Sequence, residues 1–154
     1  MNVALASDHA GQPLKQHLVD FLNTQGYGVL DLGVNSATVR ADYPDSAARA
    51  ADALKDGRAA RAILVCGSGV GICIAANKLD GIYAAICHDT YSAHQGVEHD
   101  QMNVLCLGSR VIGPAVAEEL AVAFLTAEPL AEPRYVARFE KVRAFERGER
   151  PDKA

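Results

Sequence analysis

The sequence predicts an α/β fold: a single domain with a five-stranded parallel sheet flanked by helices, and an extra helix near the C-terminus. Three observations support this prediction. Short apolar segments alternate along the chain with longer segments of helical pattern. The apolar segments are nearly continuous, which indicates strands that are buried on both faces. The chain has 154 residues, 49% of them hydrophobic, and this is enough to form the core of one domain.

The first half of the chain contains three strand–helix units. We expect strands at residues 3–6, 27–32 and 60–65, and helices at residues 13–24, 42–56 and 70–78. Pro13 and Pro44 each favour the first turn of a helix, because proline has no backbone N–H to leave unpaired there. Gly26 and Gly57 follow the predicted ends of these two helices, where glycine commonly stops a helix.

The second half continues the alternation and adds a helix. We expect strands at residues 82–87 and 103–107, and helices at residues 90–98, 111–125 and 134–147. The prolines at 129 and 133 interrupt the pattern before the last helix, which carries apolar residues between charges. This helix can pack on its own domain or on a second subunit. We therefore expect one domain over residues 1–147 and a polar tail over residues 148–154.

Charge and composition narrow the function classes. The formal net charge is −4 and the pI is about 5.7, which argues against a general nucleic-acid or anionic-membrane binder. The first residues carry no basic leader, and no apolar run approaches the ~18 residues of a membrane span. We expect a soluble cytoplasmic protein. No cysteine pair has the spacing of a zinc site. We expect small core residues at Cys73, Cys87 and Cys106, because they lie within or beside apolar segments and free cysteine is usually buried.

The most informative segment is residues 62–71, an apolar strand that runs into a glycine-rich turn and then a helix. Cys66 occupies the last strand position, and Gly67, Gly69 and Gly71 follow at every second position. Glycines let the backbone approach a ligand closely, and the helix directs free N–H groups toward the turn. The sequence therefore predicts an anion-binding cradle beside a thiol that the helix terminus favours as thiolate.

Other glycine-rich motifs fit this turn less well, and one alternative function remains. A dinucleotide fingerprint Gly-x-Gly-x-x-Gly needs glycine at position 72, where Ile72 stands. A cysteine phosphatase needs arginine at that same position. A Walker A loop is excluded because the segment lacks Gly-Lys-Ser/Thr. A nucleotide-binding module without turnover stays as the alternative from another class.

The carboxyl ends of parallel strands meet at one edge of the sheet, and ligands bind there. The polar residues at these ends are Asp8-His9, Cys66 with Ser68, His88-Asp89 and Ser109-Arg110. We expect them on one rim. His99 follows a predicted helix, which puts it at the wrong end of the sheet for this rim. Arg134 and Arg138 are four residues apart on one helix face, which is either a solvated face or a phosphate clamp.

Taken together, these motifs resemble the type B ribose-5-phosphate isomerases over residues 2–147. The segments that carry the resemblance, in order, are Asp8-His9-Ala10-Gly11, Asp42-Tyr43-Pro44, residues 66–71, Ala75-Ala76-Asn77-Lys78, Asn103-Val104-Leu105 and Gly108-Ser109-Arg110. The resemblance implies a Rossmann-like fold, no metal and no cofactor. It also implies a homodimer or dimer of dimers whose active sites are shared between subunits. The family includes galactose-6-phosphate isomerase subunits and erythrulose-phosphate isomerases.

The resemblance also implies residue roles. Cys66 matches the base that moves a proton between C1 and C2 of the sugar, and Ser68 matches a hydroxyl that handles the proton on the sugar oxygens. His99 matches the residue that opens the furanose ring, supplied by the partner subunit. Gly67, Gly69 and Gly71 match the anion hole, and Asp8 matches a residue that holds sugar hydroxyls. The phosphate-binding positions are matched by His9, Arg134 and Arg138. Arg110 matches a further phosphate or sugar contact from the partner.

One residue departs from the family pattern. Asp100 stands where asparagine is common, and a carboxylate cannot donate a hydrogen bond to an enediolate oxygen. Asp100 is therefore expected to be protonated, to turn away, or to mark a different substrate. The leading expectation is interconversion of ribose 5-phosphate and ribulose 5-phosphate. Erythrulose, allose and galactose phosphates are the alternatives.

Overall fold

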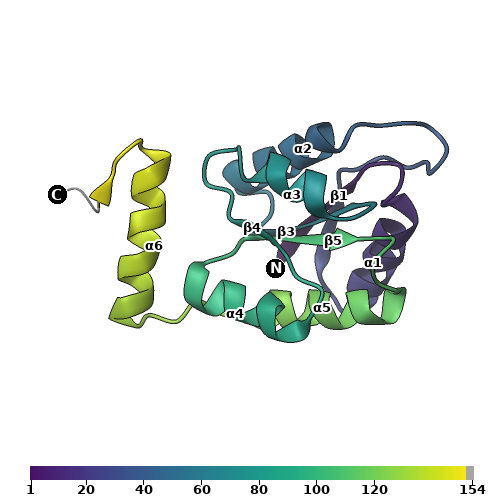
Figure 1. Ribbon diagram of the computed structural model, residues 1–154. Coiled ribbons are helices and arrows are strands. Elements are labelled where there is room, and N and C mark those ends of the chain that lie inside the picture. The colour runs from purple at the N-terminus through teal and green to yellow at the C-terminus, as the bar shows by residue number, and fades with distance from the viewer. Residues whose placement is uncertain (152–154) are drawn as a thin grey trace.

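The computed structural model describes residues 1–151 and consists of five strands and six helices in alternating order (Figure 1). The strands are β1 (Asn2–Ser7), β2 (Gly28–Asp31), β3 (Arg61–Cys66), β4 (Ala84–Ile86) and β5 (Val104–Gly108). The helices are α1 (Gln12–Thr24), α2 (Tyr43–Lys55), α3 (Val70–Ala76), α4 (Thr90–Asp100), α5 (Pro114–Thr126) and α6 (Pro133–Glu146).

The strands form one parallel sheet in the order β2-β1-β3-β5-β4. Helices α1, α4 and α5 pack on one face of the sheet, and α2 and α3 pack on the other (Figure 1). Every residue of the adjacent strands β3 and β5 is buried, as the continuous apolar runs predict. The predicted fold class is confirmed, including the separate last helix.

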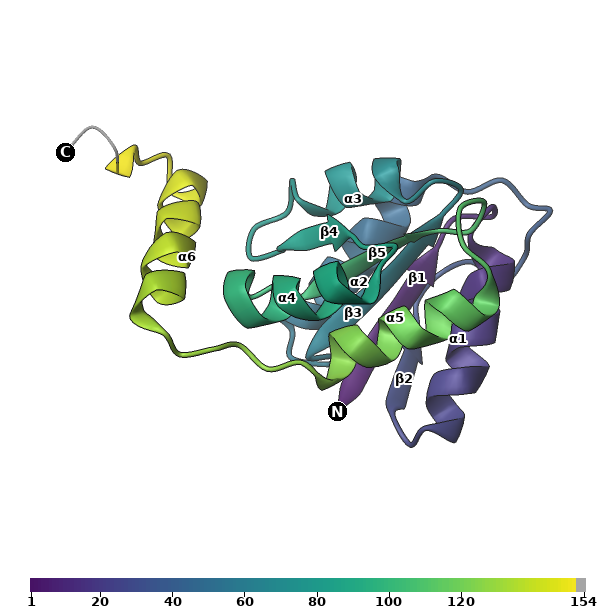
Figure 2. The ribbon, with the colours of Figure 1, turned by 60° about the horizontal axis from the view of Figure 1, so that its bottom comes forward.

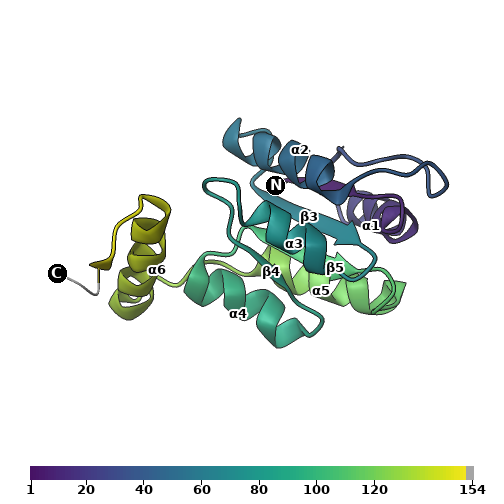
Figure 3. The same cartoon turned by 45° about the horizontal axis from the view of Figure 1, so that its top comes forward.

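Helix α6 stands apart from this three-layer body, beyond the β4 edge of the sheet (Figures 2 and 3). It contacts its own chain at a few points, one of which is the edge-to-face pair of Tyr83 and Phe139 with ring centroids 4.6 Å apart. Val136, Val142 and Phe145 of this helix are exposed. The helix therefore presents apolar surface that its own domain leaves uncovered.

Several element boundaries differ from the prediction. Strand β4 covers three residues rather than the six predicted at 82–87, and asparagine side chains bond the backbone at its start. Asn103 holds the backbone on its N-terminal side by accepting from the Tyr83 N–H at 2.8 Å. The amide of Asn77 pairs with both the N–H and the carbonyl of Ala84, at 2.9 and 2.8 Å, as a neighbouring strand would.

Three helices have a limit that differs from the prediction by two or more residues. Helix α5 begins at Pro114 rather than at residue 111, because residues 109–112 form a turn in which the Val111 and Ile112 N–H groups donate to the Gly108 carbonyl. Helix α3 ends at Ala76, and α4 continues to Asp100. Only residues 148–151 of the predicted tail lie within the described part of the chain. Within that part, no helix is long and apolar enough to cross a membrane.

Candidate active site

The turn after β3 brings a sulfur, a hydroxyl and backbone donors together. Cys66, only 4% exposed, ends the strand and accepts a hydrogen bond from the Gly69 N–H, with 3.2 Å between N and Sγ. Gly69 has a φ of +82°, a left-handed conformation that glycine adopts without steric cost, and it is the N-cap of α3. Ser68 Oγ accepts from the Val70 N–H at 3.2 Å, which leaves its hydroxyl hydrogen free to donate.

Glycines are required in this turn by close neighbours. A Cβ atom on Gly69 would lie 3.1–3.3 Å from the backbone between Leu107 and Gly108. A Cβ on Gly71 would lie 2.8 Å from the ring of Tyr43, at the start of α2. The aromatic ring therefore covers the first turn of α3 and closes one side of the cradle.

The loop after β1 adds a carboxylate and an imidazole. Asp8 is 7% exposed, and its Oδ1 accepts from the Gly11 N–H at 2.9 Å, so its other oxygen is left for a ligand. His9 Nδ1 lies 3.3 Å from the backbone nitrogen of Ala41. Gly11 itself packs so tightly that an added Cβ would be 2.3 Å from the Val65 carbonyl oxygen.

The loop after β5 completes the rim. The Ser109 hydroxyl donates to the Ala10 carbonyl at 2.9 Å, and its N–H donates to the Cys66 carbonyl at 2.9 Å. Arg110 lies over Gly67, whose added Cβ would be 3.7 Å from the guanidinium stem. Arg110 therefore lies beside the cradle of its own chain, whereas the resemblance implies a contact from the partner subunit.

These three loops line a cavity of about 580 Å³ at the carboxyl edge of the sheet. Its lining includes Asp8, His9, Tyr43, Cys66, Gly67, Ser68, Gly71 and Arg110. His88 joins the same rim, because its Nε2 accepts from the Gly108 N–H at 3.1 Å. The structure thus brings these residues together at the carboxyl edge of the sheet, as the positions of the strand ends predict.

The other predicted site residues lie at the opposite, amino edge of the sheet. His99 and Asp100 occupy the last turn of α4 and do not follow the helix as expected. The His99 ring stacks on Tyr135 of α6, with centroids 4.0 Å apart and planes 13° apart. Arg134 donates to the Tyr135 hydroxyl at 2.7 Å and pairs with Glu132 at 2.9 Å.

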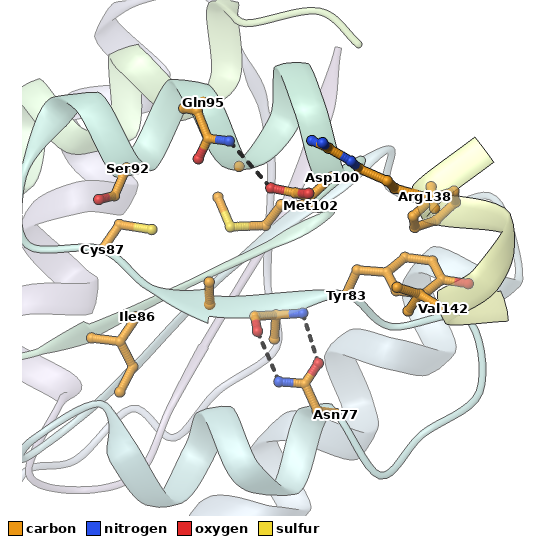
Figure 4. Close-up of a pocket in the computed structure, with 14 residues that line it drawn as sticks. Asn77, Tyr83, Ile86, Cys87, Ser92, Gln95, Asp100, Met102, Arg138 and Val142 are labelled. Atoms are coloured by element: carbon orange, nitrogen blue, oxygen red, sulfur yellow. Dashed lines mark hydrogen bonds between the residues drawn. The ribbon is translucent and has the colours of Figure 1, made fainter. Parts of the chain in front are cut away.

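A second cavity, of about 460 Å³, lies between β4, α4 and α6 (Figure 4). Arg138 extends from α6 toward Asp100, which Gln95 of α4 contacts from the other side. None of the residues that line the Cys66 cavity lines this one. Within one chain, the structure thus divides the predicted site residues into two separate groups. Gln95 was not predicted as a site residue, because a glutamine within a helix carries no sequence signal of function.

The other thiols differ from one another. Burial raises the pKa of the Cys87 thiol to about 11, and Cys106 is buried, as predicted. Cys73 is only half-buried, and a hydrogen bond from the Cys106 thiol lowers its pKa to about 7. In residues 1–151, no group of three or more His, Cys, Asp or Glu side chains has an arrangement that could hold a metal ion.

Residues 3–142 match the family described as Ribose/Galactose Isomerase. The chain is 44% identical over 128 residues to a D-erythrulose-4-phosphate isomerase of Pectobacterium atrosepticum, covering 83% of this chain and 84% of that protein. The structure of ribose-5-phosphate isomerase B from Clostridium thermocellum superposes with a TM-score of 0.92 at 40% identity, over 96% and 99% of the two chains. The Mycoplasma genitalium enzyme with bound ribulose-5-phosphate has a TM-score of 0.87 at 37% identity, over 95% and 96%.

Proposed function

The chain belongs to the ribose/galactose isomerase family of sugar-phosphate isomerases, and we propose that it interconverts ribose 5-phosphate and ribulose 5-phosphate. The proposed reaction passes through a cis-enediolate with Cys66 as the base. The observation that carries the proposal is one cavity that combines the Cys66 sulfur, the Ser68 hydroxyl and the Asp8 carboxylate with a glycine turn. This combination suits proton transfer beside a carbonyl.

The chemistry needs a base and donors for a developing oxyanion. The proton on the carbon next to a sugar carbonyl is weakly acidic, and its removal places negative charge on the carbonyl oxygen. The first bond within α3 runs from the Cys73 N–H to the Gly69 carbonyl, so the Gly71 N–H has no partner in the helix. Gly71 and Gly67 are proposed to line the anion hole, while Gly69 directs its N–H to Cys66.

The polar side chains divide the remaining tasks. Ser68 is proposed to move the proton between the two sugar oxygens, because its hydroxyl hydrogen is free to donate. The free oxygen of Asp8 accepts from sugar hydroxyls. His9 and Arg110, which line the same cavity, are proposed to bind the phosphate.

The residues at the amino edge are proposed to act on a second copy of the chain. The Cys66 cavity of the same chain is not lined by His99, Asp100, Arg134 or Arg138. Helix α6 also presents apolar side chains that its own domain leaves uncovered. A homodimer, or a dimer of dimers, can place this edge over the partner's cradle. His99 then opens the furanose ring, Asp100 contacts the sugar, and Arg134 and Arg138 bind the phosphate. Binding that remote group helps to orient the reacting carbon.

A four-carbon sugar phosphate is the second candidate. The erythrulose-phosphate isomerase of Pectobacterium atrosepticum is 44% identical to this chain.

A panel of sugar phosphates tests the proposal. The enzyme is assayed for aldose–ketose conversion of ribose 5-phosphate, erythrulose 4-phosphate, allose 6-phosphate and galactose 6-phosphate, and nucleotides are added in a thermal-shift control. We expect the highest kcat/KM for ribose 5-phosphate. A higher value for another sugar reassigns the substrate, and stabilisation by nucleotides without any turnover supports a binding module instead.

A further inference from the structure

Gln95 connects two of the residues at the end of α4. Its side-chain nitrogen Nε2 lies 2.8 Å from Nδ1 of His99, one turn further along the helix. The same nitrogen donates to Oδ2 of Asp100 at 3.3 Å. One amide group therefore contacts both an imidazole nitrogen and a carboxylate oxygen.

The chemistry of these groups fixes where the protons are. An amide nitrogen carries two hydrogens and only donates, so Nδ1 of His99 must accept with its lone pair. The neutral imidazole then carries its hydrogen on Nε2. Rotating the amide by 180° would place its oxygen against the Asp100 oxygen, and two acceptors would face each other. The carboxylate of Asp100 therefore determines the orientation of Gln95, which in turn determines the tautomer of His99.

The imidazole ring is also held in place from α6. The face of the His99 ring stacks on the ring of Tyr135, with the ring centroids 4.0 Å apart. The hydroxyl of Tyr135 in turn accepts a hydrogen bond from Arg134 at 2.7 Å. The edge that carries Nδ1 is occupied by Gln95. Since Nε2 is on the opposite side of the ring, its N–H group is directed away from Gln95.

We propose that Gln95 is a positioning residue that, together with Asp100, holds His99 as the neutral Nε2–H tautomer, a hydrogen-bond donor to the ring oxygen of a furanose substrate. This inference rests on the proposed role of His99 in ring opening. In that step the O1–H and C1–O4 bonds break, and the C1=O1 and O4–H bonds form. One water molecule carries the proton from O1 to O4, and the Nε2–H group stabilises the leaving O4 without itself ionising.

The tautomer is measured directly by nitrogen NMR of the 15N-histidine-labelled protein, without substrate. The signals of His99 are assigned by their loss in His99→Asn, at a pH of about 8.5, where an ordinary imidazole is neutral. We expect Nδ1 to carry no hydrogen in the wild type, to carry one in Gln95→Glu, and to be partly protonated in Asp100→Asn. A protonated Nδ1 in the wild type, or an unchanged Nδ1 in Gln95→Glu, overturns the proposal.

Kinetics separate positioning from a merely structural role. Ribose 5-phosphate closes a ring through O4, whereas ribulose 5-phosphate is open-chain, so exchange of its C1 proton with D2O needs no ring opening. We expect Gln95→Leu to lower turnover of ribose 5-phosphate about two- to tenfold, the size of one lost hydrogen bond, and to leave the C1 exchange unchanged. An equal loss in both reactions contradicts the positioning role.

The matched control is Gln16→Leu. Gln16 donates to Asp20 at 3.1 Å on α1, with no histidine involved, and its loss should change neither reaction. A wild type without activity on ribose 5-phosphate contradicts the proposed substrate, while the NMR result still decides the tautomer.

Discussion

The backbone N–H of Gly69 donates a hydrogen bond to Sγ of Cys66 over 3.2 Å. This contact depends on the left-handed conformation of Gly69, whose φ is +82°. The sulfur is thereby held in a cavity that Asp8, Ser68 and Arg110 also line. A strand end, a glycine turn and a short helix together place one thiol where a proton can be removed from a bound sugar.

Replacing Cys66 by alanine should abolish isomerisation and leave the fold intact. Loss of a general base lowers turnover by at least ~10²-fold. The measurement is kcat on the best sugar of the panel, with circular dichroism as the check on folding. Cys106→Ala is the control, because this buried thiol lines neither of the two cavities. Near wild-type turnover of Cys66→Ala would assign the base to another group.

Gly11→Ala should destabilise the protein by about 1–3 kcal/mol, the usual cost of overpacking. Its new Cβ would lie 2.3 Å from the Val65 carbonyl oxygen, a backbone atom that cannot move without shifting β3. Gly113→Ala is the control, because nothing lies within 4 Å of its added Cβ. Urea unfolding measures both variants. Equal stability of the two would show that the loop after β1 packs less tightly than described.

Arg134→Ala and Arg138→Ala should mainly raise KM for phosphorylated substrates. Each removes a charged donor to phosphate, worth about 1.5–3 kcal/mol, so KM should rise by roughly 10- to 100-fold. Arg143→Ala, also on α6 and paired with Glu140 at 3.0 Å, is the control. If KM stays unchanged in both test variants, the two arginines form only a solvated face.

Cys73 should be alkylated at neutral pH, while Cys87 should resist. The hydrogen bond from Cys106 lowers the pKa of Cys73 from 9.0 to about 7, so its reactive thiolate forms as the pH rises through about 7. Burial raises the pKa of Cys87 to about 11. Peptide mass spectrometry after iodoacetamide treatment from pH 6 to about 9 measures both rates. Cys106→Ala should shift the Cys73 profile upward, and an unshifted profile would remove Cys106 as the cause.

The sequence predicts the fold and the rim well because both follow from local patterns. Continuous apolar runs specify buried parallel strands, and parallel strands bring their carboxyl ends together. Asp8, Cys66 and Arg110 could therefore be grouped although they are far apart in the chain. The side-chain bonds from Asn77 and Asn103 to the backbone at the start of β4 could not be predicted, because they join residues distant in the sequence.

Residues whose roles depend on tertiary packing were not predictable. Lys15 is fully buried and paired with Asp31, although lysine is normally a surface residue. Cys73 was expected in the core but is half-buried. The contacts of Gln95 with His99 and Asp100 need a helix that continues to residue 100, whereas the sequence pattern ended it at 98.

The most direct test concerns the two groups of residues at opposite edges of the sheet, which we propose to meet between two copies of the chain. Cys66→Ala and His99→Ala subunits, each inactive alone, are co-expressed with different tags, and the heterodimer is isolated. One of its two sites then keeps both residues, so we predict about half of the wild-type activity per heterodimer. A verified heterodimer with no more activity than its inactive parents would contradict a site shared between subunits.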